Sequence, residues 1–286
     1  MANLKEIRNR ITSIGSTMKI TSAMKMVSAA KLKKAQDAIT AMRPYADKLT
    51  ELLQNLSATL DSNNGGTYAE QREVSKVLLV VVSSNRGLCG GFNTSIIKKT
   101  DRVISEKYQG KDITLYTIGK KANDILSKKY NVIKNNIEIF DNLTFDNVTV
   151  IAEELMDLFS KGDYDKIEIV YNVFKNAATQ VATLEQFLPI QPIEIEGNTS
   201  ADYIFEPTKE EIVEALIPKS LKTQLYKAIR DSYAAEHGAR MTAMHKATDN
   251  AKDLRNDLLL TYNKARQAAI TGEILEIVGG AEALNN

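Results

Sequence analysis

Two long stretches at the ends of the chain repeat apolar residues at helical spacing, and the segment between them does not. In residues 3–60 the apolar side chains recur at alternating steps of three and four, which is typical of the narrow seam of a coiled coil. The seam begins with Leu4, Ile7, Ile11, Ile14 and Met18. This pattern predicts a helix that must bury one face against another helix.

The seam changes character within the sequence SAMKMVSAAKLKKAQ. The apolar residues Ile20, Met24 and Val27 do not fit the earlier spacing, so we interpret them as a slip, after which the pattern resumes at Ala35. Pro44 lies in the resumed part. Because proline removes a backbone donor and crowds the preceding turn, we expect a kink there.

Residues 219–283 form the second helical stretch. Alanines recur every four residues between positions 235 and 251, which leaves a shallow groove that a partner backbone can approach, and residues 270–278 are strongly apolar. At about 1.5 Å per residue, each stretch would be about 80 to 100 Å long, far beyond the diameter of a small domain. One helix runs toward the middle of the chain and the other away from it, so a packed pair must be antiparallel.

The middle of the chain alternates between strand and helix patterns. After a polar linker at 61–67, the sequence predicts strands at 76–82, 113–118, 132–139, 166–174 and 180–188, and helices at 94–107, 121–129 and 148–160. Such alternation favours a mostly parallel sheet, with the last two strands forming an antiparallel hairpin through Asn176 at one edge. We therefore predict an α/β fold: a long antiparallel coiled coil of N- and C-terminal helices plus a central Rossmann-like α/β domain. The expected domains are 1–60, 75–195 and 208–286.

Charge is uneven although the formal net charge is only +1. Residues 1–36 contain eight lysines and arginines against one acid, Glu6. A basic helix can bind nucleic acid or anionic lipid, but it can equally face an acidic protein surface. Interleaved Met and Ala, and the absence of aromatic residues in this stretch, favour a protein partner. A coiled-coil adaptor for nucleic acid and a merely solvated face remain open alternatives.

Several classes of protein are disfavoured by composition. Cys89 is the only cysteine, so the disulfide framework of a small secreted protein is excluded and a reducing compartment fits best. The start MANLKEIRNRI is charged and lacks the apolar core of a signal peptide. The longest apolar run, residues 77–82, is too short to span a bilayer, so we expect any membrane association to be peripheral.

The glycine loop SSNRGLCGGFN, between a predicted strand and a predicted helix, is the main candidate for chemistry. Such a loop can bind phosphate, which would make the protein a nucleotide-binding enzyme, or it can form a tight turn that packs closely. It matches neither the dinucleotide fingerprint nor the phosphate loop. Cys89 lies near no histidine in the sequence, and we expect His237 and His245 to be half-exposed helix residues. We therefore predict no catalytic residue, metal site or cofactor, and favour a mechanical or binding role.

Four blocks of the sequence resemble the gamma subunits of the F-type rotary ATP synthase, and the resemblance runs from end to end. They are KITSAMKMVSAAKLKKAQ from Lys19, SSNRGLCGGFN from Ser83, EHGARMTAMHKATDNA from Glu236 and YNKARQAAITGEILEIVGGAEA from Tyr262. The resemblance implies a central-stalk rotor subunit that is not itself catalytic. It would transmit rotation between the ion-driven membrane ring and the catalytic alpha/beta hexamer, for ATP synthesis or hydrolysis.

The resemblance also implies partners and a location. The partners are the alpha and beta subunits, the epsilon subunit and the ring of c subunits, with no nucleic acid and with the membrane reached only through the complex. The place is the cytoplasmic face of the bacterial plasma membrane, because the chain shows no transit sequence. The plant chloroplast branch carries an insert with a cysteine pair, and since this chain has neither, thiol control is not expected.

Positions that match those of the resembled gamma subunits imply which residues contact the partners. An interface with the catalytic ring is implied for Met24, Lys25, Arg266, Gln267, Thr271 and Glu273, with Met24 and Lys25 facing the acidic lever loop of the beta subunit. A C-terminal tip held in a hydrophobic collar is implied for Ile270, Ile274, Ile277 and Val278. A foot near epsilon and the c ring is implied for Tyr203, Phe205 and Glu206. The alternative for each is coiled-coil packing or a solvated face.

Overall fold

The computed structural model describes residues 4–57, 67–190 and 209–284. In chain order the elements are α1 (Leu4–Ser57), β1 (Lys76–Val82), α2 (Phe92–Lys107), β2 (Asp112–Ile118), α3 (Lys120–Leu126), β3 (Asn131–Asn136), the 3-10 helix η1 (Glu138–Phe140), α4 (Phe145–Ser160), β4 (Lys166–Phe174), β5 (Gln180–Leu188) and α5 (Lys209–Leu284). They form two compact units. One consists of Met1–Ser28 and Met241–Asn286, and the other of Ala29–Arg240.

The first unit is an antiparallel helix pair. The hydroxyls of Thr21 and Thr248 lie 2.8 Å apart, and Lys25 Nζ lies 3.4 Å from His245 Nδ1. The partner's number falls as the number on α1 rises, which is the order of antiparallel chains. The predicted antiparallel coiled coil is therefore confirmed.

The predicted slip in the seam of α1 is wrong. Thr21, Lys25 and Ser28 continue the steps of three and four from Met18, and Thr21 and Ser28 are buried. Ile20 and Val27, by contrast, are exposed, Val27 by 58%. The seam keeps its spacing but becomes polar, because its hydroxyls bond to Thr248 and to the helix's own carbonyls.

The second unit is built on a five-stranded sheet in the order β3-β2-β1-β4-β5. β1, β2, β3 and β4 are parallel, while β5 pairs antiparallel with β4 at the edge, so the predicted sheet and its hairpin are confirmed. β3 ends at Asn136, three residues earlier than expected. The side-chain oxygen of Asn136 accepts from the backbone N–H of Ile139, which starts the 3-10 turn.

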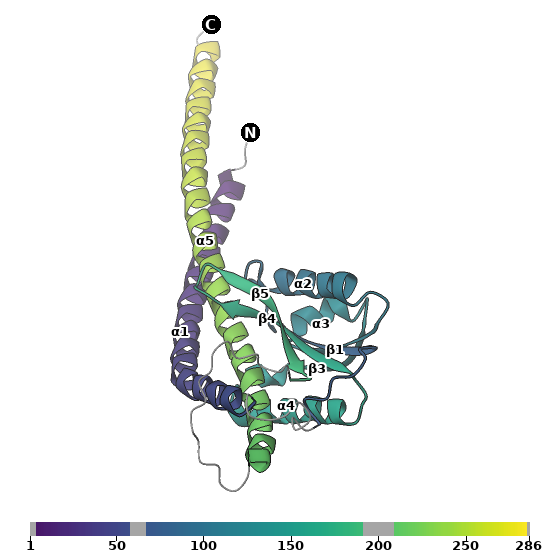
Figure 1. The fold of residues 1–286 in the computed structure, drawn as a ribbon. Coiled ribbons are helices and arrows are strands. Elements are labelled where there is room, and N and C mark those ends of the chain that lie inside the picture. The colour runs from purple at the N-terminus through teal and green to yellow at the C-terminus, as the bar shows by residue number, and fades with distance from the viewer. Residues whose placement is uncertain (1–3, 58–66, 191–208, 285–286) are drawn as a thin grey trace. The chain divides into compact units, whose positions relative to one another are not determined.

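Helices cover both faces of this sheet. Alternate residues of β1 enter two separate cores: Leu78 and Val80 pack with α4 and α5, and Val77 and Leu79 pack with α2 and α3. Figure 1 shows α2 and α3 on one side of the sheet and α4 on the other. Burial on both faces explains why the central strand reads as a continuous apolar run.

Both long helices contain a proline. α1 continues through Pro44, and Figure 1 shows it bending in its second half, which contains that proline. α5 begins at Lys209, ten residues before the helical stretch read at 219–283 and one residue after the start of the third expected domain at 208, and it includes Pro218. The buried side chains of Ile217 and Leu221 pack into the core beneath the sheet, and this packing extends the helix through the proline. No helix among the described residues is long and apolar enough to span a bilayer.

Candidate functional site

Met24 and Lys25 lie half-buried on α1, Lys25 in the seam and Met24 next to it. The backbone carbonyl of Met24 accepts a hydrogen bond of 2.8 Å from Ser28 Oγ. Lys25 Nζ lies 3.4 Å from His245 Nδ1, and His245 in turn lies 3.4 Å from a carboxylate oxygen of Asp249. These side chains border the polar part of the seam, so a partner there would meet charged as well as apolar groups.

The other predicted ring contacts lie near the C-terminal end of α5. Arg266, Gln267, Thr271 and Glu273 are exposed, and Thr271 Oγ1 donates to the carbonyl of Gln267 at 2.9 Å. Arg266 lies 21 residues beyond His245, which is about 30 Å along a helix. The structure therefore does not bring them together with Met24 and Lys25. It places them at a second level of the same helix pair.

The last turns of α5 carry exposed apolar side chains. Ile270, Ile274, Ile277 and Val278 are exposed, Ile277 by 70%, and every residue from 273 to 283 is exposed. An exposed apolar patch of this kind marks an interaction surface more often than a solvated face. The predicted foot residues Tyr203, Phe205 and Glu206 lie outside the described residues.

The glycine loop, residues 84–91, is held by its own polar groups. Ser84 Oγ donates to the carbonyl of Arg86 at 2.6 Å, and Asn93 Nδ2 donates to Ser84 Oγ at 2.8 Å. Leu88 has a φ of 61° and is 65% exposed. Cys89 is buried, and burial raises the pKa of its thiol, so it remains protonated and is a poor nucleophile.

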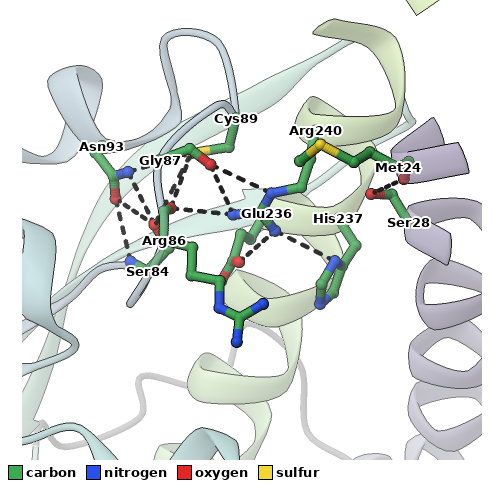
Figure 2. Close-up of polar contacts among 10 residues, drawn as sticks. All are labelled: Met24, Ser28, Ser84, Arg86, Gly87, Cys89, Asn93, Glu236, His237 and Arg240. Carbon is green, nitrogen blue, oxygen red and sulfur yellow. Dashed lines mark hydrogen bonds and ion pairs between the residues drawn. The ribbon is translucent and has the colours of Figure 1, made fainter. Parts of the chain in front are cut away.

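A buried ion pair on α5, between Glu236 and Arg240, contacts this loop through hydrogen bonds from Arg240 (Figure 2). Arg240 Nη1 lies 2.5 Å from Glu236 Oε1, four residues earlier on the helix. Arg240 Nη2 donates to the carbonyls of Arg86 at 3.0 Å and Gly87 at 3.3 Å. Burial raises the pKa of Glu236, and the charge of Arg240 opposes that rise. The loop's carbonyls thus bind the protein's own guanidinium.

His237 is buried, so the expectation of a half-exposed residue is wrong for it and right only for the exposed His245. Its ring packs edge-on against Tyr233, with centroids 4.4 Å apart. Burial lowers the pKa of His237 to about 3, and the charges of Arg240 and Lys31 add to that effect. Nδ1 of the neutral ring lies 3.4 Å from Nη1 of Arg240. Among the described residues no group of potential metal ligands gathers.

α5 occupies the crevice in which a doubly wound sheet binds ligands. The crevice lies beyond the carboxyl ends of neighbouring strands that continue to opposite sides, here β1 and β4. Ala235 and Ala239 of α5 pack there against Cys89 and Phe92 after β1 and against Phe174 at the end of β4. This geometry favours a tightly packed turn over the phosphate-binding alternative.

The sequence alone did not predict that the ion pair of Glu236 and Arg240 binds the carbonyls of loop 84–91. Its signal was present, because an acid and an arginine four residues apart face each other on a helix. Such pairs are usually solvated, and nothing local showed that this one is buried against a loop about 150 residues away in the sequence.

Comparisons with known proteins agree with one another. The family model described as ATP synthase matches residues 3–284. The ATP synthase gamma chain of Flavobacterium johnsoniae is 70% identical over the full length of both chains, and that of Christiangramia forsetii is 67% identical with the same coverage. A central-stalk chain of the mitochondrial ATP synthase of Tetrahymena thermophila is 25% identical, with a TM-score of 0.60 over 80% of this chain and 99% of that chain. A chain of the Euglena gracilis mitochondrial enzyme has a TM-score of 0.71 at 21% identity, over 98% and 94%.

Proposed function

The chain belongs to the family of ATP synthase gamma chains, and from this premise we propose that it is the central-stalk rotor subunit of an F-type ATP synthase. In this role it transmits rotation between the ion-driven membrane ring and the catalytic alpha/beta hexamer. It makes and breaks no bond of the substrate itself. Its protonated buried thiol and its neutral buried histidine suit a mechanical part better than a catalytic one.

The proposed mechanism is differential contact. Each conformation of a catalytic subunit meets a different face of the rotating helix pair, so rotation changes which conformation is favoured at each site. The partners are the alpha and beta subunits around the helix pair, with the epsilon subunit and the c ring at the other end. The chain acts peripherally at the cytoplasmic face of the bacterial plasma membrane, through the complex.

Two levels of ring contact belong to this proposal. Met24 and Lys25 form the first, where the basic stretch meets the acidic lever loop of the beta subunit. Arg266, Gln267, Thr271 and Glu273 form the second, and their exposure supports the assignment. The two levels lie about 30 Å apart along the helix, so the ring would hold the rotor at two heights.

The C-terminal tip and the foot are the remaining two proposed contacts with partner subunits. Ile270, Ile274, Ile277 and Val278 are proposed to turn inside a hydrophobic collar, and their exposure supports this because an apolar contact without directional bonds resists rotation little. Tyr203, Phe205 and Glu206 are proposed as the foot near epsilon and the c ring, on the resemblance alone.

The observation that carries the proposal is the antiparallel helix pair with an exposed apolar end, in a chain that matches gamma chains along its whole length. The test is reconstitution with alpha and beta subunits from the same organism. We expect a complex that survives size-exclusion chromatography and hydrolyses ATP rapidly, whereas the chain alone hydrolyses none. A mixture of alpha and beta subunits without this chain is the control. Hydrolysis by the purified chain alone, or failure to form a complex, contradicts the proposal.

A further inference from the structure

A charged residue lies in the seam of the helix pair. From Met244 onward the buried and half-buried positions of α5 follow steps of four and three, as in a coiled coil. These positions are Thr248, Ala251, Arg255, Leu258, Tyr262, Ala265, Ala269 and Gly272. In the described part of this unit, residues 4–28 and 241–284, every lysine, arginine, aspartate and glutamate is exposed except Lys25 and Arg255. Lys25 has His245 beside it, so Arg255 is the charged seam residue that needs an explanation.

Gly15 of α1 leaves room for the side chain of Arg255. Thr21 lies against Thr248, and in an antiparallel pair the residue six positions before Thr21 comes close to the residue seven positions after Thr248. A Cβ added at Gly15 would meet Nε of Arg255, 4.0 Å away. Gly15 is the only glycine in the sequence of α1, and glycine is among the least favourable residues in a helix interior. The missing side chain therefore makes space where the end of Arg255 lies over α1.

Neither helix brings an acid to the guanidinium of Arg255. Three and four residues from Arg255, α5 carries an alanine, a lysine and two leucines, while Asp253 and Asp257 are two residues away and do not face it. Glu6, the single acid of residues 1–36, precedes Gly15 by nine residues, about 13 Å along α1. No described residue forms an ion pair or a hydrogen bond with Arg255. The helix pair thus half-buries a cation without a compensating charge, which costs free energy in the chain alone.

We propose that Arg255 binds a carboxylate on the inner surface of the alpha/beta ring. The planar guanidinium can bind both oxygens of a carboxylate, and such a pair would compensate the half-buried charge. Arg255 lies ten residues beyond His245 and eleven before Arg266, about 15 Å from each proposed level of ring contact. A ring that surrounds both levels also surrounds the part of the helix pair between them.

The proposal rests on the proposed rotor function and gives it a further contact. Arg255 occupies one side of the helix pair, so one position of the ring at a time would meet its charge as the rotor turns. This is a specific form of the differential contact proposed above, because the ion pair would favour one conformation of the ring subunit that forms it.

The test is a competition between wild-type and variant full chains. Equal amounts of the two chains are mixed with a limiting amount of alpha and beta subunits from the same organism, at about 50 mM and at about 1 M NaCl. Mass spectrometry of the isolated complex gives the ratio of the two chains. The variant is Arg255→Met, which keeps a long unbranched side chain and removes the charge. Lys252→Met is the matched control, because it removes the same charge from an exposed side chain three residues earlier on α5.

We expect the complex to contain about fivefold more wild-type chain than Arg255→Met at low salt, and nearly equal amounts at high salt, where the ion pair is screened. Lys252→Met should compete within about twofold of wild type at both salt concentrations, because a flexible solvated side chain gains little from an ion pair. Equal incorporation of Arg255→Met at low salt would overturn the proposal. A loss of equal size at both salt concentrations would overturn it too, because the charge would then not be the cause.

A merely structural role for Arg255 predicts a different result. A polar residue in a seam can fix the register of the two helices, and its replacement would then change the stability of the free chain. We therefore expect the urea midpoint of the free chain, followed by far-ultraviolet circular dichroism, to be the same or higher in Arg255→Met. A lower midpoint with no salt-dependent loss in the competition would assign Arg255 to the register and overturn the proposal. If Arg255→Met does not fold, Arg255→Gln removes the charge but keeps a polar end, and the same outcomes decide.

The outcomes separate this proposal from the rotor function. A wild-type chain that assembles, together with an Arg255→Met chain that competes equally, refutes only the role of Arg255. A wild-type chain that does not assemble with alpha and beta subunits refutes the rotor function itself.

Discussion

Replacing Gly119 by alanine should destabilise the α/β unit strongly. Gly119 follows β2 with φ 103° and ψ 149°, a backbone conformation that is essentially restricted to glycine. An added Cβ would lie 2.3 Å from the carbonyl oxygen of Ser83 and 2.9 Å from its Oγ. The substitution therefore combines backbone strain with a clash against the backbone at the base of loop 84–91.

The size of the effect follows from these two parts. Holding alanine at this φ and ψ costs about 1 to 3 kcal/mol. Relief of the clash must move Ser83, whose N–H donates to the carbonyl of Ile118 at 2.8 Å and whose Oγ accepts from the N–H of Ala122 at 3.0 Å. Each such hydrogen bond contributes about 1 kcal/mol net. We expect Gly119→Ala to lower the free energy of unfolding by about 3 to 5 kcal/mol.

Gly110→Ala is the matched control. Gly110 also has a positive φ, 78°, but an added Cβ would meet no atom within 4 Å, so it should cost only about 1 to 2 kcal/mol. The assay is urea unfolding of the full chain followed by near-ultraviolet circular dichroism. Tyrosine dominates that signal because the chain has 11 tyrosines and no tryptophan. Equal destabilisation by the two substitutions, within about 0.5 kcal/mol, would refute the argument that the contact with Ser83 requires glycine.

Three further predictions concern His237, Met24 and the C-terminal tip. His237 binds a proton below about pH 6.5 in the unfolded chain but only near pH 3 in the folded chain, so its contribution to the free energy of unfolding is complete above pH 6.5 and is lost as the pH falls. His237→Phe should therefore reduce the loss of unfolding free energy between pH 7 and pH 5 by about 2 kcal/mol, measured by urea titration with His245→Gln as the control. An unchanged pH dependence would contradict the low pKa of His237. Met24→Lys adds like charge beside Lys25 and could form an unwanted ion pair with the acidic lever loop, so we expect fewer protons pumped per ATP in vesicles with assembly retained, and normal coupling would remove that contact from the proposal. Removal of the residues after Ile277 should weaken binding to the ring in a pull-down assay and leave the near-ultraviolet spectrum of the α/β unit intact, whereas loss of that spectrum would show that the tip stabilises the fold.

The sheet was predictable because its signals are local. Residues 76–82, 166–174 and 180–188 are strands with the predicted bounds, since turn-forming residues such as Asn176 and Pro189 follow or separate them. The antiparallel direction of the helix pair followed from chain geometry alone. Helix ends were less certain: the apolar packing of Ile217 and Leu221 extends α5 back through Pro218, and packing of that kind is not visible in the local sequence.

The site was harder to predict because it depends on distant contacts. Ile20 and Val27 are apolar yet exposed, and Thr21 and Ser28 are polar yet buried, so hydropathy alone indicated a slip where the seam in fact continues. The partner hydroxyl of Thr248 lies 227 residues from Thr21 in the sequence. In the same way, Glu236 and Arg240 looked like a solvated helix pair, because the carbonyls that bind Arg240 belong to a loop that only the fold brings near.

α5 changes its surroundings along its length, and each change suits a different mechanical task. Residues 234–240 are all buried, and Arg240 donates there to the carbonyls of Arg86 and Gly87. From Met244 to Gly272 the half-buried or buried positions follow steps of three and four, so that part can twist only together with its partner helix. From residue 273 to residue 283 every side chain is exposed, and that part presents an apolar surface with no fixed bond. A rotor needs a fixed connection where torque enters and a contact of low resistance at its free end. The one covalently continuous helix between them keeps both ends turning by the same angle, apart from its own elastic twist.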